Sequence, residues 1–469
     1  MPRHVTVMSD LEQLAAKDAT PPDPAQAFID YFCCPREFAP FRASQEPSDE
    51  EGFFRFGDAV CFGKLSAGQT TKTHLETLFD AESATHIDNR QVALAFNPTE
   101  VVESLREERY LEVEQGELFF HSIYYALRPI FPIRLRQRLQ QAVFRTRRND
   151  FPSWPVDSTV DNILAALMRL AIRANSTKEI PFIWFWPDGN EAAVMLTHDV
   201  EQQIGAEHCQ MLMDLDESFG LKAAFQVIPE RRYAGVEELV ANIRARGFEV
   251  NLHDLDHDGR LYENLRGFRE RAGKINEHGR KHNMRGFRAG AMHRNQSWFE
   301  LLDFDYEMSV PNVSHLEPQR GGCCTVMPYF VGNLLELPLT TVQDYALFYI
   351  LREQSTDLWK QQIEIISAHH GLISFILHPD YVVGERERKL CTELLRYVSE
   401  LREQRNLWVA LPSEINRWYR QRRQMQLVRD GRDWKIQGEG SERARVAYAR
   451  LVDGRVEYRL AYQGALSSR

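Results

Sequence analysis

Two histidines four positions apart, His253 and His257 in the segment NLHDLDHDG, are candidates for metal binding. The spacing alone is weak evidence, because 15 histidines in 469 residues give about 0.5 such pairs by chance. A second pair, His278 and His282, lies in the polar segment EHGRKHN, and we interpret it as solvent-exposed loop. His253 instead closes an apolar run that begins at Phe248, so the first pair is the better candidate.

Two carboxylates, Asp199 and Glu201, stand two residues apart in the segment THDVE. On an extended chain this spacing turns both side chains to the same face. Two imidazoles and one carboxylate leave open positions on a divalent ion, as a hydrolytic metal site requires. We expect one ion, Zn²⁺ first, with Fe, Mn, Co or Ni as alternatives. The second carboxylate would then act as the general base toward the attacking water.

Two further ionisable residues each follow a strand-like run. Arg288, in RGFRAGAM, would hold the free carboxylate ionised, because an adjacent cation lowers a carboxylate pKa. His378, in LISFILHPDY, would be the general acid for a leaving amine. The competing interpretations are a surface ion pair for Arg288 and a hydrogen-bonded core histidine for His378.

The chain from about Pro181 to Leu411 repeats one unit, a short apolar run followed by a helical stretch. The runs cover 192–199, 223–228, 248–254, 285–289, 306–311, 334–340, 372–380 and 407–411. Their spacing is that of βα units, which predicts an α/β fold with a distorted seven- or eight-stranded (β/α) barrel. The carboxyl ends of barrel strands meet at one mouth. The residues expected there are Asp199, Glu201, His253, His257, Arg288, Thr340 and His378.

The rest of the chain predicts accessory structure. We expect a flexible lead-in over 1–26, an N-terminal α/β region over 27–185, the barrel over 186–425 and a small β extension over 426–469. Two strands are expected around Gly57-Asp58, and a hairpin around Asp453-Gly454. Because a lone hairpin is marginal in water, we expect it to dock on another element.

Composition narrows the class of protein. With 57 Lys+Arg against 67 Asp+Glu, the net charge of −10 argues against a protein that mainly wraps nucleic acid. Seven cysteines without a C-x-x-C spacing indicate reduced thiols, and no stretch approaches 18 apolar residues. We therefore expect a cytoplasmic protein without a transmembrane segment.

The segment from His121 to Arg148 contains no acidic residue and seven arginines. It predicts a basic, partly amphipathic helix. We interpret its arginine face as solvated, with peripheral contact to an anionic polymer or membrane surface as the alternative.

Taken in order, these motifs resemble the polysaccharide deacetylases of carbohydrate esterase family four. The resemblance covers roughly residues 190–415 and is that of a divergent THDVE branch. Thr197–Glu201 match the family's acidic motif, His253 and His257 its H-x-x-x-H motif, Gly286–Ala289 its arginine motif and Leu377-His378 its closing motif. The sequence departs from the family pattern at three points. Its second carboxylate, Glu201, stands one place later than usual, and Gly290 replaces the proline that usually follows the arginine motif. No convincing Asp/Trp motif is present, and Asp344 is only a weak candidate for it.

The resemblance implies hydrolysis of an N-acetyl group on an amino sugar of a polysaccharide or glycoconjugate precursor. Asp199 would be the base, Glu201, His253 and His257 the metal ligands, and Arg288 and His378 the other catalytic residues, with the roles of Asp199 and Glu201 exchangeable. Two alternatives stay open: a C–N hydrolase acting on a small non-sugar amide, and an inactive carbohydrate-binding or scaffold subunit. Four aromatic residues near the mouth could stack on sugar faces: Tyr262, Trp298, Tyr345 and Tyr381.

Overall fold

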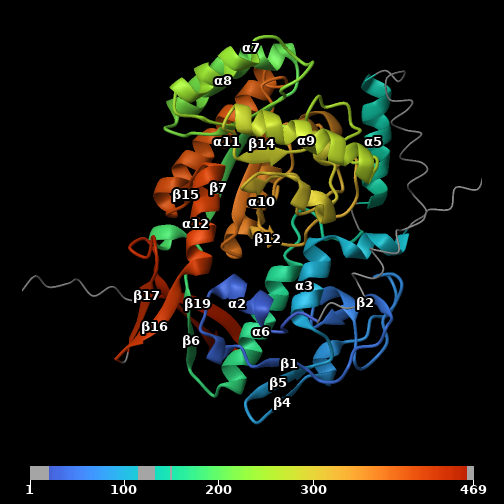
Figure 1. Cartoon of the computed structure of the whole chain (residues 1–469), viewed down its shortest axis with the longest axis vertical. Helices are drawn as coiled ribbons and strands as arrows, with labels where there is room; N and C mark the ends of the chain where they lie inside the picture. The colour runs from blue at the N-terminus through green and yellow to red at the C-terminus, as the bar shows by residue number, and fades with distance from the viewer. Residues whose placement is uncertain (1–20, 115–132, 148–149, 432, 462–469) are drawn as a thin grey trace, which may run out of the picture.

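The computed structural model describes residues 21–114, 133–147, 150–431 and 433–461 (Figure 1). Its main sheet has nine strands in the order β12-β13-β11-β10-β9-β8-β7-β14, with β15 beside β7. The strands are β7 (Ala193–Val200), β8 (Ala224–Val227), β9 (Glu249–His253), β10 (Gly286–Arg288), β11 (Tyr306–Glu307), β12 (Tyr329–Val331), β13 (Leu334–Glu336), β14 (Leu372–Leu377) and β15 (Trp408–Val409). All eight predicted runs form strands, and the curled sheet confirms the expected distorted (β/α) barrel.

Strand β12 is an addition to the predicted set. It pairs antiparallel with β13 through a tight turn at Gly332, whose φ of +59° is a left-handed conformation that suits glycine. The other neighbouring strands of the sheet are parallel. Parallel pairing places the carboxyl ends of β7, β9, β10 and β14, which carry the candidate site, at the same edge.

Helices follow most strands and cover the outside of the sheet. They are α7 (Gln203–Ser218), α8 (Val236–Ala245), α9 (Leu265–Lys281), α10 (Asp357–Ala368), α11 (Glu385–Gln404) and α12 (Pro412–Gln424). Alternate residues of β7 enter different apolar clusters. Val194 and Leu196 belong to the cluster that the helices cover, and Ala193 and Met195 belong to a second cluster that continues into the N-terminal region. Burial on both faces explains why residues 192–196, where β7 begins, are all apolar.

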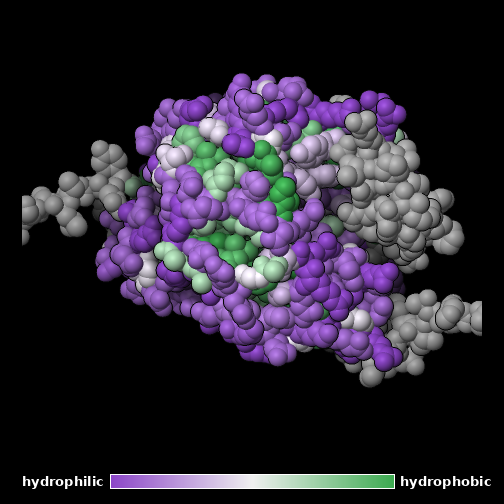
Figure 2. All heavy atoms as spheres, turned by 90° about the horizontal axis from the view of Figure 1, so that it is seen from above, coloured by the Kyte–Doolittle hydropathy of each residue, from purple (hydrophilic) through white to green (hydrophobic). Residues whose placement is uncertain are grey.

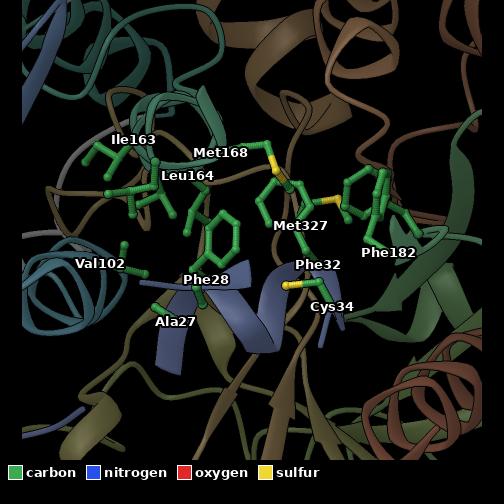
Figure 3. Packing of buried hydrophobic residues seen from close by; sticks show 14 of the residues in the cluster. Ala27, Phe28, Phe32, Cys34, Val102, Ile163, Leu164, Met168, Phe182 and Met327 are labelled. Carbon is green, nitrogen blue, oxygen red and sulfur yellow. The ribbon is translucent and has the colours of Figure 1, made fainter. Parts of the chain in front are cut away.

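The N-terminal region builds the lower half of the molecule as drawn in Figure 1. It contains α2 (Gln26–Phe32), β1 (Phe41–Ala43), β2 (Glu51–Phe56), β3 (Ala59–Lys64), β4 (His86–Asp88), β5 (Gln91–Leu94), α3 (Pro98–Arg106) and α6 (Thr159–Ala174). The predicted strand pair around Gly57 is the β2–β3 hairpin. Figure 3 shows Phe28 and Phe32 of α2 packed with Leu164 of α6, Phe182 and Met327, so one apolar cluster joins this region to the barrel.

The C-terminal hairpin around Asp453-Gly454 forms as predicted, from β18 (Val446–Val452) and β19 (Arg455–Leu460). Strand β18 also pairs antiparallel with β6 (Glu179–Ile183), the strand that precedes the barrel. A second pair, β16 (Gln426–Asp430) and β17 (Asp433–Gln437), lies beside it. The hairpin therefore docks on β6, and the three strands form a small sheet in the order β19-β18-β6.

The predicted basic helix is present as α5 (Ile133–Arg147), while 121–132 and 148 lie outside the described residues. Arg138 and Arg145 are exposed, and Gln141 donates to the carbonyl of Ile350 over 2.8 Å. The interpretation of His278 and His282 as loop is wrong. His278 lies in the last turn of α9, His282 caps that helix, and His278 faces the carboxylate of Glu230 at 3.1 Å. Within the described part of the chain, no helix combines the length and apolar character needed to cross a bilayer.

Candidate active site

The end of β9 presents His253 and the following loop presents His257. The Nδ1 atom of His253 donates to the carbonyl of Arg288 over 3.1 Å, so its Nε2 atom is the nitrogen with a free lone pair. Asp254 and His257 both have left-handed φ angles, +56° and +52°. Such conformations cost about 1–3 kcal/mol each and persist where surrounding contacts impose them. Here Arg232 donates to the carbonyl oxygens of Asp256 and His257 and fixes the loop.

Glu201 follows the end of β7 and completes a group of three possible ligands. One ligand atom each from Glu201, His253 and His257 lies within 4.8 Å of the others. The Nε2 atom of His257 is 3.0 Å from the Glu201 carboxylate. Burial opposes ionisation of Glu201, but His257 and the other two imidazoles of the site hold its pKa well below the ordinary value. The backbone N–H of Glu201 donates to Asp380 over 3.0 Å, which fixes the chain at this point.

The three residues fit a divalent metal ion. The Nε2 atoms of His253 and His257 are buried, and neither makes a well-aligned hydrogen bond within the described residues, although His257 Nε2 lies 3.0 Å from the Glu201 carboxylate. Orphaned buried nitrogens are costly unless something binds them, and both lie beside the same carboxylate. Two imidazoles and one carboxylate are a donor set typical of catalytic zinc and related ions, which bind neutral imidazole. Burial and the neighbouring His257 lower the pKa of His253, which favours that neutral form.

Asp199 lies outside this group of three and pairs with Arg288. The Nη1 atom of Arg288 is 2.6 Å from Asp199 Oδ1 and donates to Thr197 over 2.8 Å, while its Nε donates to the carbonyl of Met308. Both charged groups are almost fully buried, at 0% and 3% exposure. Burial opposes ionisation of Asp199, but Arg288, His253 and His378 together outweigh it and lower the pKa. The other Asp199 oxygen is 3.9 Å from His253 Nε2, so an ionised carboxylate faces the candidate metal position.

His378 follows β14 and faces the site from the opposite side. Its Nε2 atom is 3.8 Å from Glu201, and its Nδ1 atom is 2.6 Å from Asp344 Oδ1. The second Asp344 oxygen accepts the backbone N–H of His378 over 2.6 Å. Burial favours the neutral imidazole, but Asp344 dominates and raises the pKa of His378 to about 10. His378 is therefore protonated at neutral pH, as a general acid must be.

Asp344 is a candidate site residue that sequence reasoning underestimated. It lies in the loop between β13 and the π-helical turn η7 (Ala346–Leu351), 34 residues before His378. The usable signal was a carboxylate after a predicted strand of the barrel, which is the position of every other site residue. Thr340, also expected at the mouth, instead donates its hydroxyl to the carbonyl of Leu372 and links the segment after β13 to β14.

The four aromatic candidates form two separate groups. Tyr345, Tyr349 and Tyr381 pack on one another at centroid distances of 5.4–5.7 Å, and Tyr381 lies 4.9 Å from the His378 ring. All three tyrosines are half-buried, and Tyr345 contacts Gln140 of α5. Tyr262 and Trp298 instead stack with Phe268 of α9. Only the first group lies beside a residue of the site.

The cysteine pair Cys323-Cys324 is fully buried, and burial raises both thiol pKa values. Thiols that stay protonated are poor nucleophiles, so this pair is not a candidate for covalent catalysis. Seen from above, the surface is mostly hydrophilic, with apolar atoms showing in hollows near its middle (Figure 2).

No family model and no curated protein matches this chain. Solved structures do. A putative polysaccharide deacetylase from Mycobacterium smegmatis matches at 19% identity and a TM-score of 0.40, over 51% of this chain and 93% of that one. A putative polysaccharide deacetylase involved in O-antigen biosynthesis, from Bordetella bronchiseptica, matches at 18% identity and a TM-score of 0.31, over 50% and 86%. Puue allantoinase matches at 12% identity and a TM-score of 0.38, over 50% and 91%. Structures similar to about half of this chain thus include two described as putative polysaccharide deacetylases.

Proposed function

We propose that the protein is a metal-dependent hydrolase that removes N-acetyl groups from an amino sugar in a polysaccharide or glycoconjugate precursor. The observation that carries the proposal is the pair of orphaned Nε2 atoms, on His253 and His257, beside the Glu201 carboxylate. Around it stand a buried ionised carboxylate and a protonated imidazole. A base and an acid on either side of a Lewis-acid position are the groups that amide hydrolysis needs.

Glu201, His253 and His257 would hold the ion. Bound there, a divalent ion would supply Lewis acidity to the amide carbonyl and to the attacking water. Between the two carboxylates, the contacts favour Glu201 as ligand, because it lies beside His257 and outside reach of Arg288 hydrogen bonds.

Asp199 would accept the proton of the attacking water. Its Oδ1 atom is occupied by Arg288, which leaves Oδ2 directed toward His253 and the reaction space. Arg288 keeps this carboxylate ionised at neutral pH and fixes its orientation through bonds to Thr197 and Met308. A positioned, unprotonated base is thus available before substrate binds.

His378 would donate the proton that the departing amine requires. Its Nδ1 atom is held by Asp344, so the proton on Nε2 is the one directed toward Glu201 and the substrate. Donating this proton completes C–N cleavage, because an amine leaves far more readily than its anion. The half-buried tyrosines beside His378 offer ring faces on which a sugar can stack.

The test is acetate release by metal-loaded protein from a panel of N-acetylated oligosaccharides, with small amides in parallel. We expect acetate from at least one amino sugar, about one equivalent of metal per chain, and loss of the metal in His253→Ala. Asp199→Asn should retain the metal but lose activity. His278→Ala is the matched histidine control and should change neither measurement. Ammonia from small amides alone would support the C–N hydrolase alternative, and full metal loading with no product from any substrate would support an inactive subunit.

A further inference from the structure

A cavity of about 260 Å³ lies between the N-terminal region and the barrel, apart from the candidate active site. Helices α2 and α3 form one wall, and the β12 turn and α12 form the other. None of the six candidate catalytic and metal-binding residues lines it. The apolar cluster of Figure 3 lies directly against it, since Ala27 and Val102 belong to both.

One wall of this cavity presents a buried arginine, Arg422, that pairs with no carboxylate among the described residues. Arg422 is 2% exposed and donates only to backbone carbonyls: Nε to Trp184, and Nη2 to Tyr31 and Ile183. Its Nη1 atom has no acceptor among the described residues. Carbonyl dipoles orient a guanidinium but do not cancel its charge, so the cavity wall is cationic at this point.

Two further donors without an acceptor face the same cavity. Arg106 has its guanidinium 5.3 Å from the ring centre of Tyr329, and none of its guanidinium nitrogens finds an acceptor in the described part of the chain. The hydroxyl of Tyr419, a residue 8% exposed, likewise has no partner there. Burial raises the Tyr419 pKa, while Arg422 and Arg106 both act to lower it, so the three groups lie within electrostatic reach of one another.

The carboxylates that line the cavity do not satisfy these donors. Asp30 accepts from Gln26 and faces Arg423 at 3.5 Å, and Glu107 accepts from Arg109, which does not line the cavity. Glu103 has no side-chain partner among the described residues. Burial and the neighbouring Glu107 raise its pKa. Glu103 lies on α3 together with Arg106, and its carboxyl oxygens offer acceptors suited to hydroxyl groups of a ligand.

We propose that this cavity binds a compact polyhydroxylated anion, a sugar phosphate or sugar acid, with its anionic group on Arg106, Arg422 and Tyr419. Guanidinium groups match phosphate and carboxylate oxygens in geometry and charge, and these two arginines and the Tyr419 hydroxyl line the same cavity. The volume is slightly below the usual range of about 300–1,000 Å³ for small-molecule sites, which fits a ligand of monosaccharide size. Glu103 and the Tyr329 ring would contact the hydroxyl-bearing body. This site is independent of the proposed deacetylation.

Calorimetric titration of the full-length, metal-loaded protein tests the proposal with four probes: glucose 6-phosphate, glucuronate, inorganic phosphate and glucose. We expect saturable one-to-one binding of glucose 6-phosphate or glucuronate, and the stronger of the two identifies the anionic group. Glucose should not bind, and inorganic phosphate should bind more weakly than the sugar phosphate. Binding should persist in Asp199→Asn, because Asp199 does not line the cavity.

Two variants report on the donors. Arg106→Gln and Tyr419→Phe should each weaken binding about tenfold, since each removes a donor to a charged acceptor. Arg36→Gln, which removes an arginine from a surface ion pair with Asp23, is the matched control and should not change the affinity. Circular dichroism checks that each variant is folded. If Arg106→Gln does not fold, the affinity of Tyr419→Phe alone tests the proposal. Failure of both sugar anions to bind, or equal affinity in the wild type and both variants, would overturn the proposal.

Discussion

Replacement of Asp344 by asparagine removes the partner that keeps His378 protonated. Asp344 holds the His378 ring nitrogen and its backbone N–H, both at 2.6 Å, and raises the pKa of His378 to about 10. Without the carboxylate, the pKa should fall to the ordinary imidazole value of about 6.5 or below. At pH 8 the protonated fraction would drop from about 99% to about 3%, a loss of about 30-fold in general acid. At pH 6 most of the imidazole would remain protonated, so the variant should approach the wild type.

The assay is acetate release between pH 5 and pH 10 at saturating metal, with metal content measured at each pH. The alkaline limb of kcat should move down by about 3.5 pH units in Asp344→Asn. Asp216→Asn is the matched control. Asp216 of α7 is also a buried carboxylate beside an imidazole, because it lies 2.9 Å from His198 of β7. An alkaline limb that stays in place in Asp344→Asn, with the metal retained, would refute the assignment of His378 as the acid.

Three further changes have expected outcomes. Arg288→Lys should raise the pKa of Asp199, because Arg288 lowers that pKa through its contact with the carboxylate. The acidic limb of kcat/KM should therefore move to higher pH. An acidic limb that does not move would mean that another residue is the base. Glu108→Gln should leave the buried guanidinium of Arg294 without its counter-ion and lower the free energy of unfolding by about 3–5 kcal/mol in urea titration. Phe28→Ala should lower the free energy of unfolding by about 3–5 kcal/mol in the same titration, because Phe28 is fully buried. Acetate release at 25 °C should persist. A decrease below about 1 kcal/mol in the free energy of unfolding would contradict the packing described.

The barrel was predictable from the sequence because its strands are short and buried on both faces. Such strands appear as isolated apolar runs, and ionisable residues directly after them stand out. Strand β12 escaped prediction because it has three residues, two of them half-buried, and forms only by pairing with β13. Helix α9 extends through the polar segment around His278 because its buried stripe, which includes Phe268 and Ile275, continues to Gly279 at helical spacing.

Contacts between distant segments are what the sequence could not reveal. Asp344 precedes no recognisable motif, and its role follows only from its distance to His378. The pair of Glu108 and Arg294 joins residues 186 positions apart, and neither stands in a pattern that indicates the other. The cavity donors Arg106 and Arg422 likewise come from opposite ends of the chain. Tertiary packing creates these sites, whereas local periodicity records only the elements that carry them.

The pairing of β6 with β18 has a consequence for the order of events on the ribosome. Strand β6 is synthesised before the whole barrel, yet its partner follows roughly 260 residues later in the chain. At typical translation speeds of about 5–20 residues per second, β6 would wait on the order of ten seconds or more with an unpaired edge. A nascent chain stalled before residue 446 should therefore be a better client for chaperones than the finished protein.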